Sequence, residues 1–179
     1  MPTYKLDSGG ILPEITLPTT DGPEVMLGKP ENTSHWRLVF IYRGLHCPIC
    51  HQYLKKLDFL QEDFLQAKAE IIVASADPKE KAEAMVQQEE LTLQVAYGLS
   101  IEQMQSLGLW ISEPRSADET DQPFPEPALF AINPDGKIQL IDQSNTPFNR
   151  SDLTELLDTV IWIQENDYPI RGTYGQSTA

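Results

Sequence analysis

The stretch HCPICH, residues 46–51, contains both cysteines of the chain and two of its three histidines. A C-x-x-C pair followed by histidine can be a redox dithiol, half of a zinc site, a haem attachment point or two buried, unreactive cysteines. The motif alone does not choose among these four chemistries. The elements around it decide whether either sulfur can react.

The predicted elements place the two cysteines at a junction between a strand and a helix. Residues 37–42 (RLVFIY) form a β-branched and aromatic run that is typical of a buried strand. From Pro48 to about Lys68, apolar residues recur at helical spacing. Cys47 therefore lies at the start of a helix, where unpaired backbone N–H groups and the helix dipole favour a thiolate. Cys50 lies one turn further into the helix.

This position predicts thiol chemistry. The thiolate is the nucleophilic form of cysteine, and at helix starts the thiol pKa falls to about 3.5–7.5 from a free value of ~8.5. Attack by Cys47 on a disulfide, followed by displacement by Cys50, is the reaction that this geometry favours. Pro48 fits the same position, because a proline in the first turn removes no helical hydrogen bond. Arg43 and His46 precede the pair and could stabilise the anion.

The three other interpretations of the motif stay open. A c-type haem would need an export route, a second axial ligand and a pocket, and no export signal is visible. A zinc site built from His46, Cys47, Cys50 and His51 would be strained within one chain, although two chains could share a metal. Two unreactive cysteines would need neither Pro48 nor a position at the start of a helix.

The rest of the chain continues the alternation of strands and helices. Residues 70–77 form a second buried strand, and Asp77 followed by Pro78 predicts the N-cap and first residue of a helix over 78–90. The further predicted elements are a strand over 93–98, a helix from a Ser100 cap to Leu107, a long acidic loop over 112–127, a hairpin of strands 128–132 and 137–141 around an NPDG turn, and a helix capped by Ser151.

Length and charge limit the organisation and the partners of the protein. With 179 residues, 40% of them apolar, we expect a single α/β layered domain over 1–179, with its core at about 10–166 and a C-terminal tail over 167–179. The formal net charge of −14 disfavours nucleic acid and anionic membranes as partners. The opening MPTYKLDSGG lacks the segments of a secretory signal, so we expect a cytoplasmic protein whose C-x-x-C pair is reduced and functional.

Several longer stretches resemble the thioredoxin-like superfamily. These are CPIC after VFIYRG, GGILPEITLPTTDG near the start, VASAD, ALFAINPDGKI, TPFNR and YPIRGT. Together they are most similar to the peroxiredoxin-like branch of the alkyl hydroperoxide reductase/thiol-specific antioxidant (AhpC/TSA, redoxin) proteins. The resemblance implies a three-layer sandwich with a central mixed sheet, flanking helices and an N-terminal hairpin extension, and it implies an antioxidant thiol enzyme.

Two residues depart from the peroxiredoxin pattern. Gly44 stands where that family has a Thr three residues before its peroxidatic Cys, and Pro127 stands where it has an Arg. In the family those two side chains help to bind and polarise peroxide. Pro127 instead resembles the cis-proline that faces the C-x-x-C pair of thioredoxins. Both departures favour disulfide exchange over peroxide reduction.

We therefore predict a thiol-disulfide oxidoreductase with Cys47 as nucleophile and Cys50 as resolving thiol. Pro127, Arg43 and His46 are expected at the substrate site, and neither cofactor nor metal is expected. The substrate would be a protein or small-molecule disulfide, with an unidentified thiol as electron donor. One alternative is a peroxidase in which Cys47 becomes a sulfenic acid that condenses with Cys50. A second alternative is a redox-inert or metal-binding module. The oligomeric state stays open.

Overall fold

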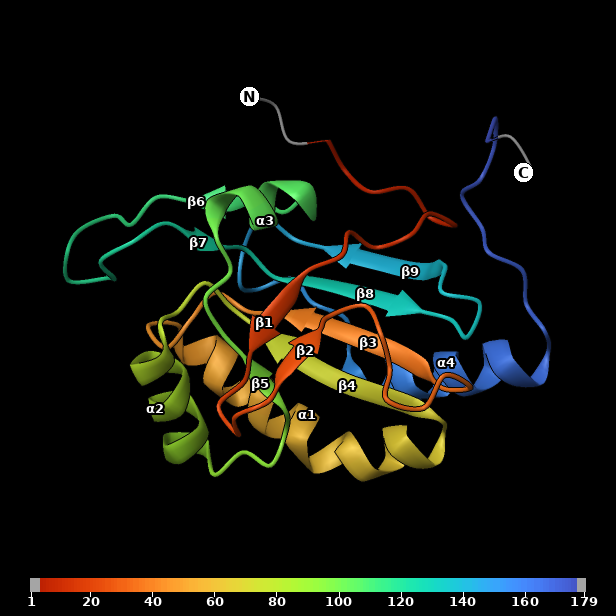
Figure 1. The fold of residues 1–179 in the computed structure, drawn as a ribbon, viewed down its shortest axis with the longest axis horizontal. Coiled ribbons are helices and arrows are strands. Elements are labelled where there is room, and N and C mark those ends of the chain that lie inside the picture. Colours follow the sequence, from red (N-terminus) through yellow and green to blue (C-terminus); the bar gives the residue numbers. More distant parts are fainter. Residues whose placement is uncertain (1–3, 177–179) are drawn as a thin grey trace.

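The computed structural model describes residues 4–176 and is built around a five-stranded mixed sheet (Figure 1). The strands, in spatial order, are β5 (Val95–Ala96), β4 (Ala69–Ala74), β3 (Trp36–Ile41), β8 (Ala128–Ile132) and β9 (Ile138–Gln143). Strands β3, β4 and β5 run parallel, whereas β8 is antiparallel to both of its neighbours. The central β3 therefore pairs with the parallel half on one side and with the predicted hairpin on the other.

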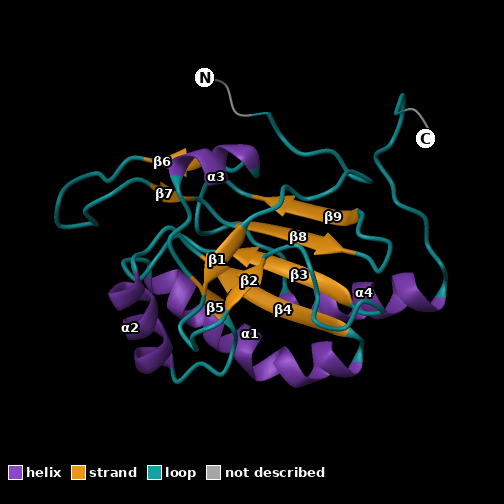
Figure 2. Ribbon diagram, viewed as in Figure 1, coloured by secondary structure: helices purple, strands orange, loops and turns teal. Residues whose placement is uncertain are grey.

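Helices cover both faces of this sheet (Figure 2). They are α1 (Pro48–Gln66), α2 (Lys79–Glu89), α3 (Ile101–Ser106) and α4 (Leu153–Glu165). Leu38 and Phe40 of β3 pack with residues of α1, α2 and α4, while Val39 and Ile41 pack with residues of α3 and the N-terminal segment. Side chains alternate between the two faces of a strand, so a strand that is apolar throughout must be buried on both sides.

Two short antiparallel pairs lie outside the central sheet. Strands β1 (Thr16–Pro18) and β2 (Glu24–Met26) form the N-terminal hairpin. Strands β6 (Ile111–Ser112) and β7 (Phe124–Pro125) pair across the acidic segment that we predicted as a loop without strands. That prediction misses these two strands because they are too short to show a period. The α/β class, the mixed sheet with flanking helices and the N-terminal hairpin are confirmed.

Two predicted helix caps are wrong. The N-cap of α2 is Pro78, and the carboxylate of Asp77 instead accepts a hydrogen bond from the N–H of Leu45 at 2.7 Å. The N-cap of α4 is Asp152, whereas Ser151 donates from both its N–H and its hydroxyl to the carboxylate of Asp142. Asp77 thus binds a partner that is distant in the sequence, whereas the carboxylate of Asp152, the residue after Ser151, caps α4 locally.

The C-terminal residues run back along the body of the protein. The carbonyl of Tyr168 accepts from the amide of Gln139, and the hydroxyl of Ser8 donates to the carbonyl of Gly172. The last part of the predicted tail, 177–179, lies outside the described residues. Within residues 4–176, no helix is both long enough and apolar enough to cross a membrane.

Candidate active site

Cys47 is the N-cap of α1. Its backbone is extended (φ −103°, ψ 102°), and its Sγ accepts a hydrogen bond from the N–H of Cys50 at 3.3 Å. Pro48 is the first helical residue, where no intrahelical N–H is needed. The predicted strand-to-helix junction is therefore present, with the sulfur at the N-terminal end of the helix dipole.

The pKa values of the two cysteines are shifted in opposite directions. A hydrogen bond from the Cys50 side chain is the main effect that lowers the pKa of Cys47 to about 6, with help from the Cys50 backbone N–H and the Arg150 cation, against the effect of burial. Burial raises the pKa of Cys50 well above its ordinary value. Cys47 thus holds a thiolate while Cys50 remains a thiol that donates to it. Their residues are 1% and 0% exposed, respectively.

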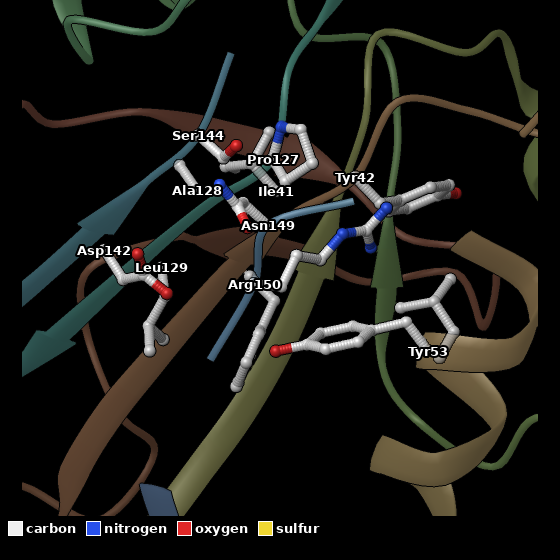
Figure 3. Close-up of a pocket in the computed structure, with 12 residues that line it drawn as sticks. Ile41, Tyr42, Tyr53, Pro127, Ala128, Leu129, Asp142, Ser144, Asn149 and Arg150 are labelled. Carbon is white, nitrogen blue, oxygen red and sulfur yellow. The ribbon is translucent and has the colours of Figure 1, made fainter. Parts of the chain in front are cut away.

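Arg150 brings a positive charge to this pair from the far end of the chain. Its Nη2 lies 3.0 Å from the Sγ of Cys50 and 4.0 Å from the Sγ of Cys47. Figure 3 shows the side chain extending between Tyr42 and Tyr53, and its guanidinium carbon lies 4.8 Å from the centre of the Tyr53 ring. We did not predict this residue. The only signal for it was its place in the TPFNR stretch of the family resemblance.

A connection between β9 and α4, residues 144–151, holds Arg150 in place. The hydroxyl of Tyr53 on α1 donates to the carbonyl of Ser151 at 3.0 Å. At the other end, the N–H of Ser144 donates to the carbonyl of Pro127 at 3.1 Å. The 144–151 segment is therefore fixed to α1 and near the start of β8, so that the Arg150 side chain reaches the buried sulfurs.

Pro127 lies beside this arrangement. It lines a small pocket of about 20 Å³ together with Tyr42, Tyr53 and Arg150, which is room for about one water molecule (Figure 3). Neither cysteine is among the residues that line this pocket. No cis peptide bond occurs within residues 4–176, so Pro127 lacks the cis bond of the thioredoxin proline that it resembles. The residue continues an extended stretch between β7 and β8, and a trans bond suits that path.

Arg43 and His46 contact the acidic loop more closely than the sulfurs. The Nε of Arg43 lies 3.1 Å from the carboxylate of buried Glu126, and both Arg43 and His46 pack on the ring of Phe124. Arg43 contributes less than Cys50 or Arg150 to the lowered pKa of Cys47. Burial, followed by the Arg43 charge, lowers the pKa of His46 to about 4. His46 is therefore a neutral ring at neutral pH and adds no charge beside the thiolate.

Gly44 has a conformation that explains its departure from the family pattern. Its φ of +144° lies in a region that residues with a side chain rarely adopt. A Cβ atom built there would lie 2.7 Å from Oδ1 of Asp77 and 3.1 Å from Nδ1 of His46. The Asp77 carboxylate thus occupies the space that a threonine side chain would need.

The histidines of the motif do not form a metal site with the cysteines. His51 directs one ring nitrogen to the carboxylate of Glu89 and the other to the carbonyl of Leu45, both at 2.7 Å. Within residues 4–176, no three His, Cys, Asp or Glu side chains gather as they would around a metal ion.

Comparison with known proteins identifies the family. The sequence model of the AhpC/TSA family matches residues 9–141. Among solved structures, a variant of peroxiredoxin 6 from Arenicola marina superposes with a TM-score of 0.74 at 20% identity, over 91% of this chain and 76% of that one. A peroxiredoxin-like protein from Aquifex aeolicus gives 0.72 at 18% identity, over 88% of this chain and 87% of that one.

A third similar structure is AhpC of Mycobacterium tuberculosis, with a TM-score of 0.71 at 17% identity over 90% of this chain and 99% of that one. At such identities the structures show a shared fold, whereas the family model matches about three quarters of the chain. No curated protein is similar enough in sequence to count as a match. The chain therefore belongs to the AhpC/TSA family of thiol-dependent oxidoreductases and peroxidases.

Proposed function

We propose that Cys47 is the attacking thiolate and Cys50 the resolving thiol of a thiol-disulfide oxidoreductase. The observation that carries this proposal is the hydrogen bond from the Cys50 N–H to the Cys47 Sγ, which joins two cysteines whose pKa values are shifted in opposite directions. A thiolate is the attacking species in disulfide exchange, and a neutral neighbouring thiol can attack once it loses its proton. The order of the two steps follows from which sulfur ionises first.

In the first step the Cys47 thiolate attacks one sulfur of a disulfide, so that a mixed disulfide forms and one substrate thiolate leaves. In the second step Cys50 loses its proton and attacks the Sγ of Cys47, which releases the second substrate thiolate. The substrate gains two electrons, and the protein is left with a Cys47–Cys50 disulfide. A thiol donor must then supply two electrons to restore the pair.

A second candidate function is peroxide reduction, and the burial of both sulfurs favours it. A hydroperoxide is small enough to reach a buried sulfur with little rearrangement of its surroundings, whereas a protein disulfide needs a more open sulfur. The Cys47 thiolate would attack one peroxide oxygen, which breaks the O–O bond and releases an alcohol or water. Cys50 would then condense with the sulfenic acid and release water. Arg150 would supply the cation that the family places at the position of Pro127.

Turnover measurements separate the two candidates. The reduced protein is mixed with hydrogen peroxide or with a small disulfide such as bis(2-hydroxyethyl) disulfide, and formation of the Cys47–Cys50 disulfide is followed by mass spectrometry. Cys47→Ser should abolish both reactions. Cys50→Ser should stop after the first step, leaving a trapped mixed disulfide or a sulfenic acid on Cys47. Trapping by Cys47→Ser instead would reverse the assigned roles.

The ratio of the two second-order rate constants decides the substrate class. A faster reaction with the disulfide supports the oxidoreductase, and a much faster reaction with peroxide supports the peroxidase. If neither reagent oxidises the pair at a rate above that of a free thiol, both proposals are wrong and the cysteines are structural.

A further inference from the structure

We propose that His51 is a positioning residue that fixes the Leu45 peptide and, through it, the reactive geometry of Cys47. The inference rests on the proposed role of Cys47 as nucleophile. His51 lies in the first turns of α1, directly after Cys50, and its side chain is 17% exposed. Its side chain therefore links the first turns of α1 to the loop that precedes the helix.

Both ring nitrogens of His51 are engaged by acceptors. Nε2 lies 2.7 Å from the carbonyl oxygen of Leu45, and Nδ1 lies 2.7 Å from Oε1 of Glu89 at the end of α2. A carbonyl cannot donate, and neither can a carboxylate. The contact to Leu45 therefore requires a proton on Nε2. Glu89 also faces Lys55, whose Nζ lies 3.8 Å from its second oxygen.

Leu45 is also held through its other backbone group. The N–H of Leu45 donates to the carboxylate of Asp77 at 2.7 Å, while the carbonyl accepts from His51. Asp77 follows β4, His51 belongs to α1 and Glu89 belongs to α2. Two side chains from separate parts of the chain therefore fix one residue of the loop, two positions before Cys47, and Glu89 holds one of them, His51.

Fixing this loop matters because the acidity of Cys47 depends on geometry. The main effects that lower the pKa of Cys47 are hydrogen bonds from Cys50, and these form only when Cys47 has the extended N-cap conformation. The turn into the helix is closed by the N–H of Cys47, which donates to the carbonyl of Gly44 at 3.2 Å. Movement of the Leu45 peptide would displace both ends of that turn.

The test measures Cys47 directly and needs no substrate. The rate of Cys47 alkylation by iodoacetamide is followed by peptide mass spectrometry between pH 5 and 9. His51→Phe keeps an aromatic ring but removes both donors, and it should slow alkylation about tenfold at pH 5.5, which corresponds to one pKa unit. Lys55→Met removes the ammonium group beside Glu89 without changing any contact to Leu45. It therefore serves as the matched control, and its alkylation profile should equal that of the wild type.

Glu89→Gln distinguishes an effect of the position of the His51 ring from an effect of the Glu89 charge. The amide that this substitution introduces can donate to Nδ1, so a neutral ring can still donate from Nε2 to Leu45, and most of the alkylation rate should remain. A loss as large as that of His51→Phe would show that the charge of Glu89, and not the position of the ring, affects Cys47, which would overturn the positioning role. A His51→Phe profile equal to the wild-type profile, with only a lower melting temperature, would overturn it as well.

A second measurement on the unaltered protein keeps the inference testable if His51→Phe fails to fold. Nitrogen-15 NMR of the reduced protein should show a proton on Nε2 of His51. A ring without a proton on Nε2 would contradict the contact to Leu45. Because neither readout involves turnover, a failure of the proposed function would leave these results unaffected and is recognisable on its own.

Discussion

Arg150 and Cys50 are one hundred residues apart in the chain, yet Nη2 of the arginine lies 3.0 Å from Sγ of the cysteine. The arginine belongs to the 144–151 segment, and the cysteine is buried at the start of α1. Since Cys50 stays protonated, the charge of Arg150 acts chiefly on the neighbouring thiolate of Cys47, 4.0 Å away. Through Arg150, the 144–151 segment thus contributes to the charge state of Cys47.

Replacing this arginine should weaken the nucleophile. The Arg150 cation is one of the effects that lower the pKa of Cys47, so Arg150→Met should raise that pKa, by up to about one unit. Such a change reduces the thiolate population about tenfold at pH 5 and about twofold at pH 7. Alkylation rates measured across this range provide the check. Arg171→Met, which removes a contact to Tyr168 in the C-terminal segment, is the control and should react like the wild type.

The pH profile of the unaltered protein should show the lowered pKa of Cys47 directly. Alkylation of Cys47 should reach half of its maximal rate near pH 6, well below the pKa of an ordinary cysteine. The same shift affects folding, because between pH 6 and 9 the unfolded chain binds the proton that the folded chain has released. This contribution to the free energy of unfolding is present above pH 9 and is lost as pH falls through 6. Half-maximal alkylation above pH 8 would contradict our inference that the surroundings of Cys47 at the start of α1 lower its pKa.

Restoring the family threonine should harm the fold rather than create a better peroxidase. Gly44→Thr combines an unfavourable φ with a clash against Asp77, so we expect a loss of about 2–3 kcal/mol in the free energy of unfolding. Gly22→Thr is the matched control, because Gly22 also has a positive φ, of +113°, but no atom lies within 4 Å of an added Cβ. Urea denaturation of both variants gives the comparison. Equal losses would show that the Asp77 clash is relieved without cost.

Pro127→Ala tests the predicted substrate-site proline. The ring lines the pocket beside Arg150 and Tyr53, and it makes no contact that sets the acidity of Cys47. We therefore expect kcat/KM for a small disulfide to fall roughly fivefold, about 1 kcal/mol, while the alkylation profile of Cys47 is unchanged. Pro134→Ala, in the NPDG turn, controls for the loss of a proline. An altered Cys47 profile would mean that Pro127 acts on the nucleophile and not on the substrate.

The reactive part of the site could be predicted because its signals are local. An apolar run, a glycine and a proline at the first turn are enough to place Cys47 at the start of α1, and the structure confirms that placement. The NPDG turn between two apolar runs likewise predicted the hairpin of β8 and β9.

The parts that could not be predicted depend on contacts between distant residues. Asp77 before a proline satisfies the local rule for a helix cap, but burial beside the N–H of Leu45 offers the carboxylate a tertiary partner instead. Arg150 has no local feature that directs it to a cysteine, because its position depends on how the 144–151 segment binds Tyr53. His51 directly follows Cys50, yet only the fold brings Glu89 into contact with it.

The contact of Arg150 with the sulfurs has a consequence for the redox couple. A cation that favours the thiolate stabilises the reduced form of the pair. It does not stabilise the uncharged disulfide to the same extent, so it raises the reduction potential of the pair. For this two-electron couple, about 30 mV corresponds to ~1.4 kcal/mol. The Cys47–Cys50 disulfide should therefore accept electrons more readily than it would without Arg150, and a mild thiol donor would be sufficient to regenerate the protein.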